Sequence, residues 1–384
     1  MKKLLILGAS GSIGQQTIDL LINNRITYDF VGFSVGKNVE YIDIALSKFK
    51  SVKFVYLIDD EKKEIFSKKY ADLHFFSEKD GFEAFIKAVN PDVVVNALVG
   101  FAGVIPTLET IKLGKDLMLA NKESLVVAGD LVNELLKTSS TKLIPIDSEH
   151  VAIDKCLQHV EKSMVQKIIL TCSGGPFRDK TKEELMGVKV EDALKHPTWK
   201  MGNKITIDSA TLINKVFEII EAHYLFDYDF EHIEVMIHPE SKVHSMIELK
   251  NEQMLLDYGP NDMRIPIEYA LSYRKNIDLN MDEFVKNAAE LHFFSPNEFQ
   301  NDVLSIAKTV IEQKGTMGCI LNAANDFLVE KFLNKEISFL DIYKYIHLAM
   351  QNITCTKKYN VQDIISTNNI VKYYLQTKIE EDKQ

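Results

Sequence analysis

Continuous hydrophobic runs alternate with amphipathic segments through the first 146 residues of the chain. Such runs are typical of parallel strands that are buried on both faces of a sheet. Helical periodicity fills the intervals between them, so the pattern predicts an α/β fold with a doubly wound, Rossmann-like sheet. The predicted strands are Leu4–Leu7, Val31–Val35, Phe54–Ile58, Val93–Ala97, Leu117–Leu119 and Leu143–Ile146.

The pattern changes after residue 146. Alternating strands are predicted at Val235–His238 and Val243–Leu249, among helices and polar loops, which indicates an α+β region. A polar stretch with little periodicity follows, and from residue 300 the period is again helical. We therefore expect four segments: an N-terminal Rossmann-like domain at 1–146, a central α+β domain at 147–275, a linker at 276–298 and a C-terminal helical domain at 299–384.

Composition narrows the class of protein. The 384 residues are 46% hydrophobic and 26% charged, with a net charge of −10. The negative charge argues against nucleic acid or an anionic membrane as a partner, although a local basic pocket could still bind phosphate. The four cysteines form no CxxC pair, which is typical of free thiols in a reducing cytosol. No run reaches the roughly 18 apolar residues of a membrane span, and the short N-terminal run breaks at Gly8, so we expect a buried strand rather than a signal peptide in a cytoplasmic protein.

A glycine-rich turn, GASGSIG at residues 8–14, follows the first predicted strand and opens a helix. Gly8, Gly11 and Gly14 give a GxxGxxG variant of the dinucleotide-binding turn, in which glycine allows a tight turn and close approach to a pyrophosphate. The helix N-terminus would then favour the phosphates. The same turn can also form without a ligand, so the motif alone leaves both possibilities open.

The end of the second predicted strand bears on the choice of dinucleotide. NAD-selective sites place an acidic residue there for the ribose hydroxyl. Here the strand leads into Gly36, Lys37 and Asn38, and the first carboxylate is Glu40. A lysine and an amide suit a 2′-phosphate, which favours NADPH. The alternative is that Lys37 is an ordinary solvated loop lysine.

Two carboxylates follow the last strand of the first region. Asp147 and Glu149 alternate in IDSEH (146–150), so in extended backbone both would face the same way. Two oxygen ligands at the mouth of a sheet could begin a site for Mg²⁺ or Mn²⁺. The alternative is a solvated acidic turn.

A helix with chemically varied residues is predicted within residues 196–226. Asp208 or Ser209 would serve as its N-cap, and Asn214, Lys215 and Glu218 would share one face. An amide, a lysine and a carboxylate could bind a hydroxyl, a phosphate and a metal. An ordinary surface face with a Lys–Glu ion pair is the alternative.

Two nearby loops add candidate ligand-binding groups. The SGGPF loop at 173–177 has backbone N–H groups that could cradle an anion. His196 precedes Pro197, which favours extended or turn backbone and makes it a plausible substrate donor. Trp199 is the only tryptophan, and it could cover a ligand or be half-buried packing.

Taken together, these motifs resemble the 1-deoxy-D-xylulose 5-phosphate reductoisomerase family. The motifs occur in the family's order, and the long central one is very specific. The matching segments are GASGSIG (8–14), GKN (36–38), ANKES (120–124), IDSEH (146–150), SGGPF (173–177), HPTWKMGNKITIDSATLINKVFE (196–218), HPESKVHSMIE (238–248), GPNDMRIPI (259–267) and LNAAND (321–326).

The resemblance implies NADPH- and Mg²⁺- or Mn²⁺-dependent conversion of 1-deoxy-D-xylulose 5-phosphate to 2-C-methyl-D-erythritol 4-phosphate, a step of non-mevalonate isoprenoid precursor biosynthesis. It also implies a homodimer, with NADPH bound by the N-terminal domain and with the central domain supplying both the catalytic residues and the dimer interface.

The resemblance further implies a set of site residues. Metal ligands are implied at Asp147, Glu149 and Glu218, and catalytic roles at Lys122, Glu149 and His196. Substrate contacts are implied at Lys122, Ser148, Glu149, Ser173, His196, Ser209, Asn214, Lys215 and Glu218. Cofactor contacts are implied at Ser10, Gly11, Ser12, Ile13, Gly36, Lys37, Asn38, Asn121, Glu123 and Gly202. Trp199 corresponds to a flap that closes over the substrate.

The chain departs from the family pattern at three places. Ala9 and Ser10 stand in a turn that is usually GSTGSIG, and Ser10 keeps the hydroxyl. Cys172 precedes SGGPF where alanine or glycine is usual, which could make the loop oxidisable. Asp326 ends LNAAND where glutamate is usual, away from the predicted chemistry.

Two alternatives come from other classes of protein. A metal-free NADP-dependent aldehyde or semialdehyde dehydrogenase would need a nucleophilic cysteine, and no cysteine has a convincing base beside it in the sequence. A non-enzymatic NADP-sensing protein would leave Asp147, Glu149 and Glu218 without a role.

Overall fold

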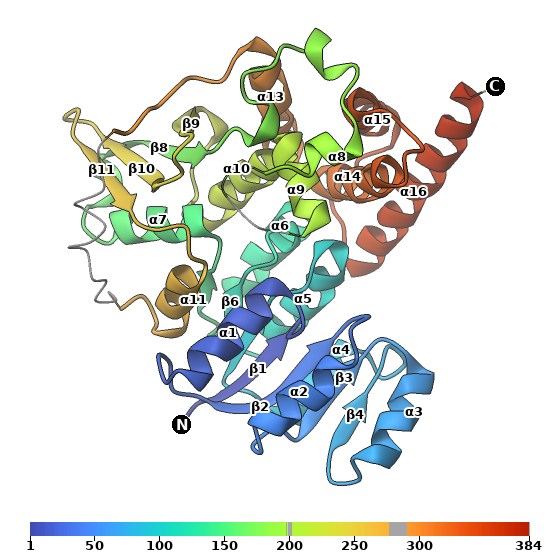
Figure 1. Cartoon of the computed structure of the whole chain (residues 1–384). Helices are drawn as coiled ribbons and strands as arrows, with labels where there is room; N and C mark the ends of the chain where they lie inside the picture. The colour runs from blue at the N-terminus through green and yellow to red at the C-terminus, as the bar shows by residue number, and fades with distance from the viewer. Residues whose placement is uncertain (197, 199–201, 276–289, 384) are drawn as a thin grey trace. The chain divides into compact units, whose positions relative to one another are not determined.

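The structure is a computed structural model that describes residues 1–196, 198, 202–275 and 290–383 (Figure 1). The chain divides into two compact units. The first unit contains the described parts of Met1–Ser124, Leu131–Asp147 and Asp262–Ile277, and the second contains those of Leu125–Asp130, Ser148–Asn261 and Asp278–Gln384. The predicted boundaries of the sequence-based domains stay a prediction.

The first unit is built on a parallel sheet of seven strands in the order β4-β3-β2-β1-β5-β6-β7. Strands β2 to β4 are added in sequence on one side of β1, and strands β5 to β7 on its other side. This reversal in strand order defines a doubly wound, Rossmann-like sheet. The predicted fold class is thereby confirmed. The strands are β1 Lys3–Leu7, β2 Asp29–Val35, β3 Phe54–Leu57, β4 His74–Phe76, β5 Val93–Asn96, β6 Asp116–Leu119 and β7 Leu143–Pro145.

All the strands predicted from hydrophobic runs in this region are present, because their residues are buried on both faces of the sheet. The sequence prediction missed β4, which has only three residues and therefore gives little pattern. The helices of this unit, with α6 extending into the second, are α1 Ser12–Ile22, α2 Tyr41–Lys48, α3 Asp60–Lys69, α4 Gly81–Val89, α5 Val104–Lys112, α6 Glu123–Leu136 and α11 Arg264–Leu271.

Helix α11 packs on α1 although it lies far along the chain. Glu268 forms an ion pair with Arg25 at 2.9 Å, and the Tyr28 hydroxyl donates to the carbonyl oxygen of Leu271 at 2.5 Å. The core beneath it includes Ile18 and Ile267. The chain therefore returns to the first unit after forming the second sheet.

The second unit contains a mixed sheet of four strands in the order β11-β10-β8-β9. β8 pairs with β9 in parallel and with β10 in antiparallel register, and β11 is an edge strand. The strands are β8 Val165–Cys172, β9 Ile233–Ile237, β10 Val243–Leu249 and β11 Met254–Tyr258, and the helices α7 Ser148–Leu157, α8 Val190–Ala193, α9 Asn203–Ala210 and α10 Ile213–Phe226 accompany them.

Four helices complete the second unit: α13 Glu298–Gln313, α14 Met317–Leu333, α15 Phe339–Asn352 and α16 Val361–Asp382. Asn297, Ser338 and Asn360 begin three of them with capping boxes, in which side chain and backbone satisfy each other's hydrogen bonds. Val216 of α10 and Ile320 of α14 belong to one hydrophobic core, so α10 packs together with the C-terminal helices.

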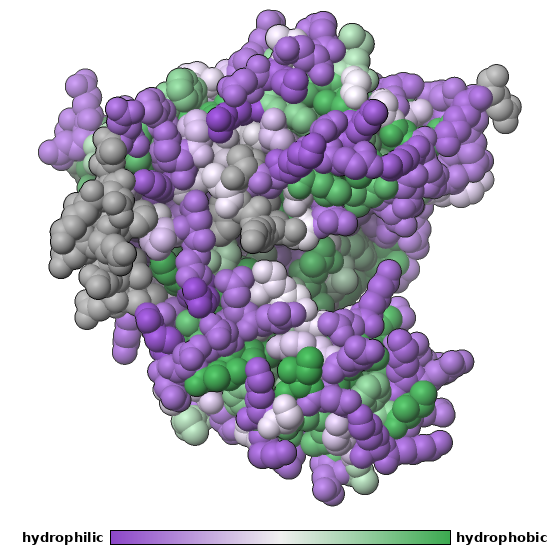
Figure 2. All heavy atoms as spheres, viewed as in Figure 1, coloured by the Kyte–Doolittle hydropathy of each residue, from purple (hydrophilic) through white to green (hydrophobic). Residues whose placement is uncertain are grey.

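Within the described residues, no helix is both long and apolar enough to cross a lipid bilayer. The face seen in Figure 2 is mainly hydrophilic, with smaller hydrophobic areas between the charged side chains. This distribution is ordinary for a folded chain whose apolar residues are largely used in cores.

Candidate active site

The predicted dinucleotide-binding residues of the first unit lie at one edge of its sheet. Residues 8–13 follow β1, residues 36–38 follow β2 and residues 121–123 follow β6. Carboxyl ends of parallel strands share one edge, and β1 is the strand beside which the order reverses. Ligands of doubly wound sheets bind at this position.

The glycine turn is shaped by close backbone packing. Gly8 has a φ of 85°, and a Cβ atom there would lie 2.6 Å from the carbonyl oxygen of Ala97. A Cβ atom at Gly14 would lie 2.4 Å from the carbonyl oxygen of Gly8. Gly11 caps α1 without a side-chain hydrogen bond, and Gly11 and Ser12 are exposed. The turn therefore presents the start of α1 to solvent, where a phosphate would meet backbone N–H groups.

Lys37 and Asn38 are exposed after β2, beside the half-buried Gly36. Asn121 and Glu123 behave differently, because both side chains are buried and form hydrogen bonds with the backbone of the loop that follows β5. Asn121 donates to the carbonyl oxygen of Leu98 at 2.9 Å, and Glu123 accepts from the N–H of Gly100 at 3.1 Å. These two side chains hold the loop at the sheet edge, and their contact with a cofactor stays a prediction.

Lys122 and Asp147 form an ion pair at the same edge of the sheet. Lys122 directly precedes α6 and Asp147 directly precedes α7, so the neighbouring strands β6 and β7 bring them together. Only about a tenth of either side chain is exposed, 10% for the lysine and 9% for the aspartate. The pairing offsets the cost of burying each charge.

Lys215 is the centre of a second, deeper charge cluster. Its ammonium lies 2.9 Å from Glu149 Oε1, contacts the Glu218 carboxylate and donates to the carbonyl oxygen of Thr171 at 2.6 Å. Burial alone would lower the pKa of Lys215, but the charges of Glu149 and Glu218 outweigh it and raise the pKa above its ordinary value. Lys215 is therefore a buried, charged ammonium that neutralises two carboxylates.

The shared face predicted for Asn214, Lys215 and Glu218 is confirmed. Asn214 and Lys215 both donate to the Glu218 carboxylate from positions four and three residues earlier in α10. This is the spacing at which side chains meet on a helix surface. The face is buried rather than a solvated ion-pair surface, because α10 lies in the core of its unit.

The predicted N-cap of this helix was wrong. Asp208 and Ser209 lie inside a separate helix, α9, and α10 begins after Leu212, whose φ is 60°. The left-handed residue turns the chain between the two helices. Ser209 therefore reaches the site from the end of α9.

The extended backbone predicted for Asp147 and Glu149 was also wrong. α7 begins at Ser148, so Glu149 lies in the first helical turn, where the helix dipole favours an acidic residue. The Ser148 hydroxyl donates to Glu149 Oε2 at 2.6 Å. The two carboxylates still come close, but through the start of a helix rather than along one strand face.

Asp147, Glu149 and Glu218 form one of two groups in the described part of the chain that could hold a metal ion. Each residue offers one oxygen atom, and these atoms all lie within 4.8 Å of one another. An all-oxygen donor set fits a hard divalent cation such as Mg²⁺ or Mn²⁺ better than Zn²⁺. Lys122 pairs with Asp147, and Lys215 pairs with Glu149 and Glu218, so each of the three carboxylates has a lysine partner.

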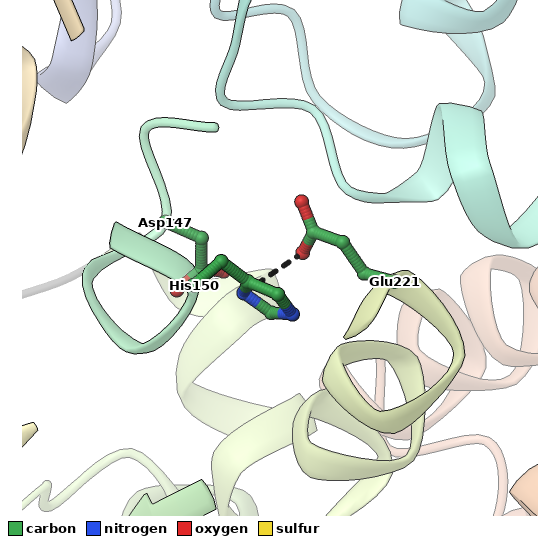
Figure 3. A group of neighbouring side chains, drawn as sticks. All are labelled: Asp147, His150 and Glu221. Carbon is green, nitrogen blue, oxygen red and sulfur yellow. Dashed lines mark ion pairs between the residues drawn. The ribbon is translucent and has the colours of Figure 1, made fainter. Parts of the chain in front are cut away.

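The other group consists of Asp147, His150 and Glu221 (Figure 3). The ring of His150 bridges α7 and α10: its Nδ1 is 3.4 Å from Glu221 Oε2, and its Nε2 is 2.9 Å from the backbone oxygen of Glu218. Both side chains are fully buried. This bridge joins the helices that carry Glu149 and Glu218, and sequence reasoning missed it because it depends on tertiary contact.

His196, Ser173 and Ser209 form a cluster of neutral donors. His196 Nε2 lies 3.3 Å from Ser173 Oγ and 3.1 Å from Ser209 Oγ. The N–H of Thr198 donates to Nδ1, which places the proton of a neutral ring on Nε2. Burial lowers the pKa of His196, which keeps the ring neutral.

The SGGPF loop is pressed against α9. Gly175 has a φ of 65°, and a Cβ atom there would lie 2.8 Å from the backbone oxygen of Ser209. Gly202, a predicted cofactor contact, precedes α9 in the second unit, and its carbonyl oxygen accepts from the Thr206 hydroxyl. Trp199, the predicted flap, lies outside the described residues.

Cysteine chemistry does not support a nucleophilic mechanism. Burial raises the pKa of Cys156 and Cys319 to about 12 and also raises that of Cys172. A thiol with a raised pKa carries little thiolate at neutral pH, and the thiolate is the nucleophile. The aldehyde dehydrogenase alternative is therefore not favoured.

A doubly wound sheet with a glycine turn, in a chain that also carries an all-oxygen ligand group, is typical of metal-assisted, dinucleotide-dependent enzymes. Three family models cover most of the chain. The model for 1-deoxy-D-xylulose 5-phosphate reductoisomerase matches residues 4–129, that for its C-terminal domain residues 143–226, and that for the DXP reductoisomerase C-terminal domain residues 258–374.

Curated relatives agree over their whole length. The 1-deoxy-D-xylulose 5-phosphate reductoisomerase of Listeria innocua is 40% identical over 98% of this chain and 100% of its own. That of Caldanaerobacter subterraneus subsp. tengcongensis is 43% identical over 96% of this chain and 97% of its own. The chain belongs to the 1-deoxy-D-xylulose 5-phosphate reductoisomerase family.

Solved structures show the same fold. The Zymomonas mobilis reductoisomerase in complex with NADPH superposes with a TM-score of 0.88 at 32% identity, covering 99% of each chain. A DOX-P reductoisomerase in complex with NADPH, fosmidomycin and magnesium gives a TM-score of 0.90 at 32% identity, covering 100% of each chain.

Proposed function

We propose that this protein converts 1-deoxy-D-xylulose 5-phosphate to 2-C-methyl-D-erythritol 4-phosphate with NADPH and a divalent metal ion. The observation that carries the proposal is the oxygen-ligand group of Asp147, Glu149 and Glu218 in a chain of this family. The reaction rearranges a ketose phosphate skeleton and then reduces an aldehyde, so it needs charge stabilisation on neighbouring oxygens together with a hydride source.

Asp147, Glu149 and Glu218 are the residues that would hold the ion. A bound divalent cation would stabilise negative charge on the substrate's carbonyl and hydroxyl oxygens, and bound NADPH would supply hydride. Lys122 lies beside Asp147 and could donate a proton or offset charge at the same oxygens. The Glu149 carboxylate accepts hydrogen bonds from the Ser148 hydroxyl and the Lys215 ammonium, and these two bonds hold it in one orientation.

Ser173, His196 and Ser209 are proposed to bind the substrate's phosphate end. Two hydroxyls and an imidazole N–H converge within hydrogen-bond distance, and each can donate to an anion. Asn214 and Lys215 are proposed to add an amide and a positive charge from α10. Holding the phosphate away from the reacting carbons lets its binding energy position the substrate.

Ser10, Gly11, Ser12, Ile13, Gly36, Lys37, Asn38, Asn121, Glu123 and Gly202 are proposed to form the NADPH site. The exposed start of α1 supports pyrophosphate binding, and the exposed Lys37 supports recognition of a 2′-phosphate. We also propose a cytoplasmic homodimer without nucleic-acid or membrane partners. The exposed Met254 and Leu256 on the edge strand β11 support self-association.

The function is tested by supplying 1-deoxy-D-xylulose 5-phosphate, NADPH and Mg²⁺ and identifying the product. We expect NADPH oxidation to match the formation of the branched product. An aldehyde dehydrogenase would instead reduce NADP⁺ in the presence of an aldehyde and would form no branched carbon skeleton. An NADP-sensing protein would bind NADPH without consuming it.

Lys37→Asp is expected to reduce the preference for NADPH over NADH. The change removes a cation from the end of β2 and adds the carboxylate that suits a free ribose hydroxyl. The ratio of kcat/KM for the two cofactors should fall by about tenfold or more, because one charged hydrogen bond is worth roughly 1.5–3 kcal/mol. Lys53→Asp, an exposed change before β3, is the matched control. Equal use of both cofactors by the unmodified protein would contradict this assignment.

A further inference from the structure

The LNAAND motif (321–326) lies on α14, outside the groups so far assigned to the reaction, and contains buried polar residues that face α9. Asn325 is fully buried and donates from Nδ2 to Asp208 Oδ1 at 2.8 Å. Asp208 is only 2% exposed. A hydrogen bond between two fully buried side chains therefore joins α14 to α9, which pack together in the second unit (Figure 1).

Lys204 completes this contact from one turn earlier in α9. Its ammonium lies 2.8 Å from Asp208 Oδ2 and 3.2 Å from Asp326 Oδ1. Asn322 donates to the other oxygen of Asp326 at 3.1 Å. The residue that departs from the family pattern, Asp326, is thus part of a polar network that links two elements of the unit.

The network is costly to bury. Burial raises the pKa of the Asp208 carboxyl, while Lys204 and Asn325 act in the opposite direction by stabilising the charged form. Replacing buried ion pairs by well-packed apolar residues is often neutral or stabilising, so stability alone is a poor reason for such a network. Its value lies in fixing one arrangement of the two helices.

The packing of α9 against α14 also determines the position of Ser209, a proposed phosphate-binding residue. Ser209 follows Asp208 directly, and its hydroxyl lies 3.1 Å from His196 Nε2. On its other side, Gly175 of the SGGPF loop packs closely against the Ser209 backbone oxygen. A small rotation of α9 would change the position of the Ser209 hydroxyl relative to His196, which also contacts the Ser173 hydroxyl.

We propose that Asn325 is a positioning residue for the substrate's phosphate site: through Asp208 it fixes the end of α9, and thereby Ser209, relative to His196 and the SGGPF loop. The proposal rests on the proposed phosphate-binding role of Ser209 and His196. It gives the C-terminal helices a part in substrate affinity, although Asn325 has no direct role in the chemistry.

The test compares Asn325→Leu with Asn368→Leu, using the full-length protein. Leucine is close in size to asparagine but cannot donate to Asp208. Asn368 is also a buried asparagine of the helical region, on α16, and among the described residues the side-chain partners of Asp208 are Asn325 and Lys204 instead. Dissociation constants for inorganic phosphate, fosmidomycin and NADPH are measured for both variants, at a temperature at which circular dichroism shows that they are folded.

Asn325→Leu should weaken phosphate and fosmidomycin binding about tenfold or more, as expected for losing a hydrogen bond to a charged group. It should raise KM for the substrate while leaving the NADPH dissociation constant unchanged, and Asn368→Leu should change none of these values. In an Asp208→Ala background the same substitution should add less than about a twofold effect, because the two residues act through one contact. If Asn325→Leu does not fold, Asn325→Ala is used in the same comparison.

Equal effects of Asn325→Leu and Asn368→Leu on phosphate binding would overturn the proposal. It would also be overturned if the losses of phosphate affinity caused by Asp208→Ala and Asn325→Leu simply added in the double variant. Loss of NADPH affinity alongside phosphate affinity would also overturn it, since that would indicate general damage to the fold. Failure of the proposed function is distinguishable, because it would appear as absence of turnover in the unmodified protein.

Discussion

Glu218→Gln is expected to remove most turnover while leaving NADPH binding nearly intact. The substitution replaces a charged oxygen ligand by a neutral carboxamide of the same size within the Asp147–Glu149–Glu218 group. Turnover should fall on the order of 100-fold or more. Removing a side chain that only supports a metal ligand already lowers activity roughly 10- to 100-fold, and Glu218 is proposed to be a ligand itself. Binding of Mn²⁺, followed by its electron paramagnetic resonance signal, should weaken in parallel.

Glu234→Gln is the matched control for this change. Glu234 lies in the same unit and pairs with Lys167, but its side chain is 44% exposed and belongs to no ligand group in the described residues. It should keep its Mn²⁺ affinity and turnover. Unchanged turnover in Glu218→Gln would show that the cluster is an ordinary buried charge network.

Lys215→Met is expected to destabilise the metal-free protein strongly. The change removes the ammonium that neutralises Glu149 and Glu218, so the half-buried Glu149 carboxylate and the buried Glu218 carboxylate lose the opposite charge that this helix supplies. Breaking a buried pair by removing one partner costs roughly 3–5 kcal/mol. Chemical unfolding in EDTA should therefore show a lower free energy of unfolding than the unmodified protein.

Mg²⁺ should recover more stability in Lys215→Met than in the unmodified protein, because a cation that binds only the folded state stabilises it and the lysine no longer competes. Phosphate affinity should fall more than NADPH affinity if Lys215 also serves the substrate's phosphate. Lys167→Met, which breaks a half-exposed pair, should cost about 1 kcal/mol or less and show no Mg²⁺ dependence. An equal response of both variants to Mg²⁺ would count against a cation site at these carboxylates.

The parallel sheet could be predicted from the sequence because each of its longer strands is buried on both faces and gives an uninterrupted hydrophobic run. β4 escaped this reasoning because three residues carry no period. Local spacing was enough to place Asn214, Lys215 and Glu218 together, since helical geometry alone makes them neighbours.

Tertiary contacts could not be predicted in the same way. The sequence gives no reason for Lys215 to reach Glu149, which lies 66 positions earlier. The bridge from His150 to Glu221 likewise exists only because α7 packs against α10. The left-handed Leu212 separates α9 from α10, and without it the segment from Asp208 onward has the pattern of one capped helix.

The resemblance to the family supplied what local rules could not, namely that Asp147, Glu149 and Glu218 belong to one group. The structure adds the physical setting of that group. Two lysines share its three charges, and a buried histidine bridge joins the helices that carry two of its members.

We expect this chain to rearrange and reduce 1-deoxy-D-xylulose 5-phosphate only with a divalent ion in place. The most direct measurement follows 2-C-methyl-D-erythritol 4-phosphate formation with NADPH before EDTA, after EDTA, and after Mg²⁺ or Mn²⁺ is returned in excess. We predict that product formation stops in EDTA and recovers with either ion, while NADPH remains bound throughout. Undiminished product formation in EDTA would contradict the account.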